Sequence, residues 1–107
     1  MDTKIAIDAL SALAQPHRLN AFRALIAAGE SGLTPSELAE RLALLPNTLS
    51  FHLKALAHAD LVVVERQGRS LLYRANYAHM NALLGFLTEN CCQGEACALS
   101  EVERCDC

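Results

Sequence analysis

The sequence is poor in aromatic residues, with no tryptophan, two tyrosines and three phenylalanines among 107 residues. A chain of this length forms one domain with a modest core. That core must therefore come mainly from leucine, alanine and valine. No apolar run approaches the roughly 18 residues that a membrane-spanning helix needs, and residues 1–4 do not begin a signal-peptide pattern. We therefore expect a cytoplasmic protein with no membrane partner.

Positive charge is also scarce overall, because nine lysines and arginines face twelve acidic residues, for a net charge of −3. Taken alone, this balance argues weakly against a nucleic-acid partner. The charge is unevenly distributed, however: residues 46–74 carry four basic and two acidic groups, whereas residues 89–107 carry one basic and five acidic groups. A small basic patch in residues 46–74 is enough for phosphate contacts if a dimer doubles it.

Cysteine is absent from the first 90 residues, and all five cysteines follow: Cys91, Cys92, Cys97, Cys105 and Cys107. Thiols of a cytoplasmic protein stay reduced, so metal binding or redox chemistry is favoured over a disulfide framework. We expect a folded domain over residues 1–90 and a cysteine-rich, acidic tail over residues 91–107.

The apolar pattern predicts three helices in the first part of the chain. A first helix is expected over residues 3–15. Pro16 punctuates it, and a second helix follows that ends before Gly29. The third begins at Thr34-Pro35-Ser36-Glu37. Threonine as N-cap, proline at the first helical position and glutamate at the third form a capping box.

A short turn joins the third helix to a fourth over residues 46–58, and two helices joined this tightly are typical of a helix-turn-helix. Leu49, Leu53 and Leu56 form the buried stripe of the fourth helix. Its opposite side lacks acids and is rich in groups that bond base edges or phosphates. A solvated amphipathic helix is the alternative interpretation of this segment taken alone.

Two β-prone runs, residues 61–65 and 70–74, flank Arg66-Gln67-Gly68-Arg69. A glycine-bearing turn between such runs indicates a hairpin. A basic tip can lie along a phosphate backbone, although it can also be merely solvated. Three helices, a fourth that serves as the reading helix and a hairpin together predict a winged helix-turn-helix. This fold is mainly α with a β-hairpin.

From Asn76 the chain is again helical, with Met80, Leu83, Leu84 and Leu87 at the spacing of one helix face. A leftover apolar terminal helix often pairs with its own copy in a two-fold dimer, and packing back onto its own domain is the alternative. We expect a homodimer held by the first and last helices. Its contact residues include Ile5, Leu10, Met80, Leu84 and Leu87. Gly94 is expected to end the last helix.

The candidate DNA contacts come from the reading helix and the hairpin. His52 lies beside the buried stripe, so packing in the core is an equal alternative for this residue. The full set is Asn47, Thr48, Ser50, Phe51, His52, Lys54, Arg66 and Arg69.

Three stretches resemble the ArsR/SmtB family of bacterial repressors. They are residues 12–19 (ALAQPHRL), residues 47–56 (NTLSFHLKAL) and Gly68-Arg69 at the hairpin tip. The resemblance covers roughly residues 8–88. It implies a winged-helix homodimer on an operator of inverted-repeat symmetry, released when a metal or metalloid binds.

The sequence also departs from the family at both of its usual metal sites. Arsenic sensors often carry a Cys-x-Cys pair in the helix before the reading helix, and residues 36–41 contain no thiol. Zinc-type members use Asp and His ligands along the last helix, where this chain offers only His79.

The remaining candidate metal ligands are Cys91, Cys92 and Cys97, an adjacent pair and a third cysteine as in some arsenic-responsive members. Thiolates select soft ions, and trivalent arsenic and antimony favour three sulfur ligands. Tetrahedral zinc commonly takes Cys-x-x-Cys units, which are missing here, although Cys105 and Cys107 keep zinc, cadmium or lead open.

The sequence therefore predicts a DNA-binding transcriptional repressor released from its operator by As(III) or Sb(III). A thiol-redox or persulfide sensor on the same frame is the alternative. No catalytic base lies in a recognisable arrangement with the cysteines, so we do not expect an enzyme.

Overall fold

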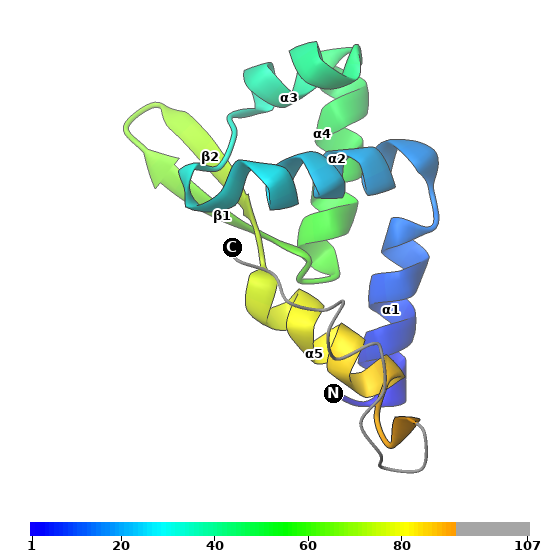
Figure 1. The fold of residues 1–107 in the computed structure, drawn as a ribbon. Coiled ribbons are helices and arrows are strands. Elements are labelled where there is room, and N and C mark those ends of the chain that lie inside the picture. The colour runs from blue at the N-terminus through cyan, green and yellow to red at the C-terminus, as the bar shows by residue number, and fades with distance from the viewer. Residues whose placement is uncertain (92–107) are drawn as a thin grey trace.

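Helix α2 (Pro16–Ala28) lies at the centre of the fold, with most of the other elements packed against it (Figure 1). The structure is a computed structural model that describes residues 1–91. Helix α1 (Thr3–Leu13) precedes α2, and the short 3-10 helix η1 (Gly29–Ser31) follows it. The later elements are α3 (Pro35–Leu42), α4 (Pro46–His58), β1 (Val62–Gln67), β2 (Ser70–Ala75) and α5 (Tyr77–Leu87).

The core is built almost wholly from leucine and alanine, as the scarcity of aromatic residues predicts. Valine contributes little to it, since Val62 is the one valine among the buried residues of 1–91. Helix α1 buries only its alanines, Ala6, Ala9 and Ala12, against the domain. Its larger apolar residues, among them Ile5 and Leu10, are left on the outer side.

Local capping signals fix the helix boundaries. The capping box at Thr34 is present, with the Thr34 and Glu37 side chains each bonded to the other's backbone N–H. Helix α1 ends at Leu13, two residues earlier than predicted. The cause is Gln15, which is extended and whose side chain accepts a hydrogen bond from the Arg18 N–H at 2.9 Å. A residue before proline avoids helical backbone, so Gln15 caps α2 rather than extending α1.

The turn between α3 and α4 is tight. Ala43 takes a left-handed backbone (φ 54°), and the Leu44 N–H donates to the Ala39 carbonyl at 3.0 Å. This closing pattern ends a helix sharply and satisfies its last carbonyls. Pro46 then opens α4 without delay. The predicted helix-turn-helix is confirmed.

The hairpin is longer than predicted and its turn is shorter. Strands β1 and β2 pair antiparallel from Val62 with Ala75 to Gln67 with Ser70, so only Gly68 and Arg69 form the turn. Gly68 has φ 63°, as expected for the glycine-first pattern of a two-residue hairpin turn. The prediction that Arg66 belongs to the turn is wrong, because strand pairing continues past it and places Arg66 opposite Leu71.

The hairpin base is joined to the helical part by one further β-bridge. Leu33, in the segment after η1, pairs with Tyr73 of β2. Each residue's N–H donates to the other's carbonyl at 2.9 Å. The hairpin is thereby tied to the segment that leads into the helix-turn-helix.

The last helix is also shorter than predicted. Helix α5 ends at Leu87, so Cys91 lies beyond the helix and Gly94 does not end it. The Thr88 hydroxyl bonds back to the Leu84 carbonyl at 2.8 Å, and residues 88–90 form a turn. The predicted ligands Cys92 and Cys97, together with Cys105 and Cys107, lie outside the described residues. Within residues 1–91, none of the helices has the length and apolar character needed to cross a membrane.

Candidate nucleic-acid interface

Helix α4 presents one polar face to solvent. Leu49, Leu53 and Leu56 are almost completely buried. The opposite side is exposed along its length, and five of the residues predicted to contact DNA lie on it. They are Asn47, Thr48, Ser50, Phe51 and Lys54. An amphipathic helix with its polar face open is the form in which a reading helix enters a major groove.

His52 is not on that face. Its side chain is only 7% exposed, and its Nδ1 accepts a hydrogen bond from the Arg18 Nε–H at 3.2 Å. Its inclusion among the DNA contacts is therefore corrected: His52 packs between α4 and the start of α2. The sequence left this alternative open because position 52 borders the leucine stripe.

The surroundings of His52 favour its neutral form. Burial lowers the pKa of His52 below its ordinary value, and the positive charge of Arg18 and the neighbouring His17 lower it further. The His17 and His52 rings lie 5.5 Å apart. Because Nδ1 accepts the Arg18 hydrogen bond, the neutral ring carries its proton on Nε2.

Arg18 extends this cluster onto the exposed face of α4. Its guanidinium carbon lies 5.6 Å from the centre of the Phe51 ring. Sequence reasoning did not assign a role to Arg18, although it lies in the residue 12–19 stretch that carries the family resemblance. The sequence pattern does not show that Arg18 contacts His52, because the two residues are 34 positions apart in the chain.

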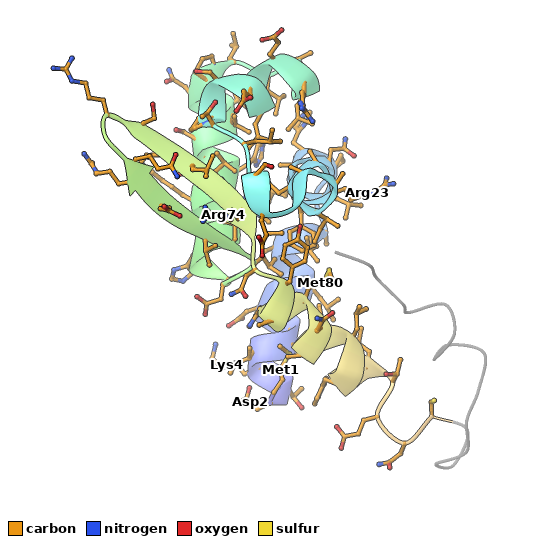
Figure 2. The ribbon with its side chains drawn as sticks, turned by 60° about the vertical axis from the view of Figure 1, so that its left-hand side comes forward. Met1, Asp2, Lys4, Arg23, Arg74 and Met80 are labelled. Atoms are coloured by element: carbon orange, nitrogen blue, oxygen red, sulfur yellow. The ribbon has the colours of Figure 1, made fainter. Side chains whose placement is uncertain are left out.

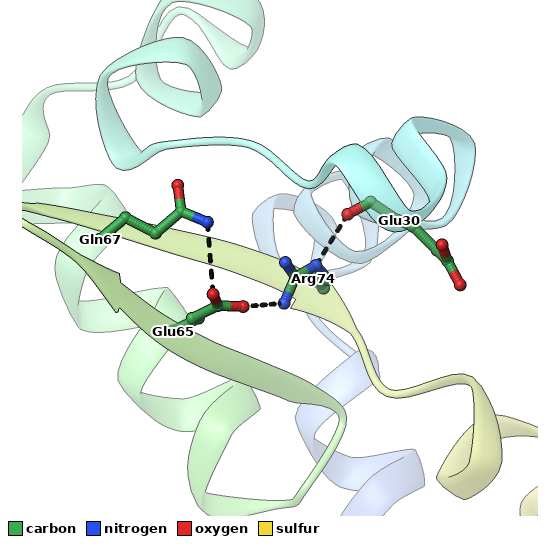
Figure 3. Close-up of polar contacts among 4 residues, drawn as sticks. All are labelled: Glu30, Glu65, Gln67 and Arg74. Atoms are coloured by element: carbon green, nitrogen blue, oxygen red, sulfur yellow. Dashed lines mark hydrogen bonds and ion pairs between the residues drawn. The ribbon is translucent and has the colours of Figure 1, made fainter.

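Two of the three arginines in the hairpin are exposed to solvent. Arg66 and Arg69 are exposed, and Arg69 borders a hollow shared with Thr34 and Pro35 at the start of α3. Arg74 is different (Figure 3). It donates to the Glu65 carboxylate and, through Nε, to the Glu30 carbonyl at 2.7 Å. Arg74 thus fastens the hairpin to η1 and does not belong to the basic patch.

Glu65 shares this network. The Arg74 hydrogen bond holds the pKa of Glu65 below its ordinary value, and a second hydrogen bond from Gln67 at 3.3 Å acts in the same direction. The charges of Glu65 and Arg74 offset each other. The positive charge left for a partner in this region therefore comes from Lys54, Arg66 and Arg69.

Residues 1–91 contain no group of three or more His, Cys, Asp or Glu side chains that could hold a metal ion. His79 is half-buried, and its Nε2 atom has no hydrogen-bond partner in this part of the chain. Cys91 is the first of the predicted ligands and the only one described. Its N–H donates to the Thr88 carbonyl at 3.0 Å.

Known proteins resemble this chain in sequence and in fold. Residues 13–65 match a family model described as a helix-turn-helix domain. NolR from Sinorhizobium fredii is 31% identical, with a TM-score of 0.64, over 80% of this chain and 83% of NolR. An ArsR-like transcriptional regulator from Rhodococcus sp. RHA1 is 25% identical, with a TM-score of 0.74, over 94% of this chain and 91% of the regulator.

The chain belongs to the ArsR family of winged-helix regulators. A third similar structure is described as a possible transcriptional regulator for arsenical resistance. It is 25% identical, with a TM-score of 0.66, over 89% of this chain and 92% of that protein. No curated protein sequence matches the chain. In this ArsR-family fold α4 is the second helix of the helix-turn-helix, and the β1–β2 hairpin is the wing.

Proposed function

We propose that this ArsR-family regulator is a homodimeric repressor that binds an operator through α4 and the wing. The observation that carries the proposal is the open polar face of α4, which offers amide, hydroxyl and ammonium groups from Asn47, Thr48, Ser50 and Lys54. Such groups read base edges and bond phosphates. The exposed Arg66 and Arg69 add sequence-independent contacts to the backbone.

Dimerisation is supported by apolar surface on α1 and α5, which lie side by side at the end of the molecule away from the wing tip (Figure 2). Ile5, Leu10, Leu84 and Leu87 are between 39% and 55% exposed. An apolar hollow of about 560 Å³ between α1, α2 and α5 is lined by residues that include Leu10, Phe22 and Met80. Contiguous apolar surface of this kind marks an interface.

A two-fold dimer presents two copies of α4. Two reading helices bind half-sites about one helical turn, roughly 34–36 Å, apart. The operator is therefore expected to be an inverted repeat, and operator affinity is expected to require the dimer.

The inducer we propose is trivalent arsenic or antimony, bound by the thiolates of Cys91, Cys92 and Cys97. The support is the donor chemistry of the sequence, since soft thiolates select such ions, and the description of one similar structure as a possible regulator for arsenical resistance. When bound, the ion would hold three thiolates at one point.

Two hydrogen bonds between Cys91 and α5 support coupling of the proposed site to the dimer interface. Cys91 is bonded through its N–H to Thr88, whose hydroxyl is bonded to the Leu84 carbonyl in the last turn of α5. A displacement at Cys91 therefore acts on α5 and on the spacing of the two reading helices. The coupling needed is modest, since about 1–3 kcal/mol changes operator affinity roughly 5–150-fold.

Titration of the operator complex with arsenite tests this function. A duplex is first selected from a randomised pool with the full chain, and its binding is followed by fluorescence anisotropy in the presence of a phosphine reductant. Arsenite should release the wild-type protein but not Cys97→Ser. Cys107→Ser is the matched control, and a chain truncated after Ser100 should respond as the wild type does.

Two results would contradict the inducer site. If arsenite fails to release the truncated chain from the operator but still releases Cys97→Ser, the ligands are Cys105 and Cys107. If arsenite has no effect under reducing conditions but oxidation releases the operator, the thiol-redox alternative is correct.

A further inference from the structure

Phe51 is the large apolar residue of the reading face. Its side chain is 64% exposed in the middle of α4, although burying a phenylalanine is worth roughly 2–3 kcal/mol elsewhere in a fold. Asn47 and Lys54 lie one turn before and one turn after it, on the same side of the helix. An aromatic ring thus stands among hydrogen-bonding groups on the surface proposed to meet DNA.

The ring of Phe51 is held from two sides. The guanidinium of Arg18 lies over it at 5.6 Å, and the His52 ring meets it edge-on, with centroids 5.5 Å apart and an interplanar angle of 67°. The Arg18 side chain is in turn fixed by its Nε–H bond to His52, and its backbone N–H donates the capping bond to the Gln15 side chain. An exposed side chain held by a buried residue of its own helix and by another helix is pre-organised for contact.

We propose that Phe51 reads the C5-methyl group of a thymine in the major groove and that Arg18 is the positioning residue for its ring. The proposal rests on the proposed DNA-binding function. The thymine methyl is the apolar group that a base pair presents in the major groove, whereas the other edges present donors and acceptors. A phenylalanine ring can contact that methyl group but has nothing to pair with a donor or an acceptor.

The role of Arg18 depends on its shape as well as its charge. A planar guanidinium stacks on a ring and donates from Nε at the same time, whereas a lysine ammonium is a compact point charge on a flexible stem. Arginine can therefore hold the Phe51 ring in one orientation. Without it, the ring keeps only its edge contact with His52 and loses part of that pre-organised position.

Replacement of thymine by deoxyuridine tests the contact, because it removes the methyl group and keeps the base pairing. The duplex is the one selected by the full wild-type chain, and each thymine is replaced in turn in both half-sites. We expect a position at which wild-type affinity falls about fourfold per half-site, the value of one buried methyl group. Phe51→Ala should bind more weakly and should lose no further affinity at that position. Ser50→Ala, on the same face, should keep the fourfold ratio.

Phe51→Leu tests the positioning role without touching Arg18, and its exposed site keeps the fold intact. Leucine is apolar but lacks the ring that the Arg18 guanidinium faces, so it is not held against the methyl group and the thymine-to-uracil ratio should fall toward one. Arg18→Lys should lower the ratio in the same way, with its melting temperature measured alongside. If Phe51→Leu keeps the wild-type ratio, the positioning role of Arg18 is refuted.

Failure of this inference and of the proposed function give different results. If no duplex is selected or bound, the DNA-binding function itself is wrong. If a duplex is bound but no deoxyuridine weakens the wild type, or if Phe51→Ala remains sensitive at the same position, the function stands and the thymine contact is refuted.

Discussion

At the scale of single residues, His52 links the stability of the domain to pH. Its neutral form accepts the Arg18 hydrogen bond, and its pKa in the folded chain lies below the ordinary value. The unfolded chain therefore binds a proton more readily than the folded one, so stability rises with pH in this window. The stabilisation is present above the ordinary pKa and is lost as the pH falls through the lower folded value.

We expect the free energy of unfolding, measured by urea denaturation, to decrease as the pH is lowered from 7.5 to 5. His52→Gln should flatten this dependence, because the glutamine oxygen can accept the Arg18 hydrogen bond at every pH in the range. An unchanged slope in His52→Gln would assign the effect to other groups.

Gly32 is required by both its backbone and its surroundings. It has φ 65°, and an added Cβ would lie 2.6 Å from the Tyr73 carbonyl oxygen. Gly29 has φ 67° but nothing within 4 Å of an added Cβ. Both glycines take a backbone region that is essentially restricted to glycine, so either alanine should lower the free energy of unfolding by about 1–3 kcal/mol. Gly32→Ala should lose more than Gly29→Ala, because its Cβ also meets the Tyr73 carbonyl. Urea denaturation of the two variants measures the difference, and equal losses would show that the close approach to Tyr73 is harmless.

At the scale of elements, the helices could be predicted closely because their signals are local. The Thr34 capping box and the prolines at positions 16, 35 and 46 mark helix starts within a few residues of sequence. The hairpin turn was predicted two residues too early, because pairing of Gln67 with Ser70 depends on the partner strand. The Arg18–His52 and Arg74–Glu30 contacts join residues 34 and 44 positions apart, beyond the reach of local patterns.

The wing is expected to contribute phosphate contacts without sequence preference. Arg69→Ala should weaken binding to specific and non-specific duplexes alike, and should reduce the slope of log affinity against log salt by about 1 per wing. Anisotropy titrations over a range of salt concentrations measure both quantities. Lys4→Ala is the charge-matched control, because Lys4 lies on α1 and pairs with Asp8. Relaxed sequence preference at an unchanged salt slope would place Arg69 at a base edge instead.

At the scale of the whole molecule, the apolar faces of α1 and α5 are expected to hold the dimer. Leu84→Glu places a charge in this seam, and burying it unpaired is costly. The dimer dissociation constant should rise about hundredfold or more, and operator affinity should fall with it. Sedimentation at micromolar concentration measures the first effect. Ala78→Glu is the control, because Ala78 is exposed on the opposite side of α5.

A Leu84→Glu protein that remains dimeric would place the interface on another surface. If Ala78→Glu dissociated as readily, the loss would reflect the added charge on α5 and not its position, and the proposed interface on the Leu84 side would be contradicted.

The reciprocal bridge between Leu33 and Tyr73 limits how often the base of the wing opens. The two residues bond each other through both pairs of backbone groups, so neither amide can exchange with solvent deuterium until the bridge opens. Their exchange rates should therefore report a single opening free energy, whereas the Gln67–Ser70 pair beside the turn frays on its own. The tip of the wing can then adjust to a phosphate backbone many times for each opening of its base, while the reading helix stays in place.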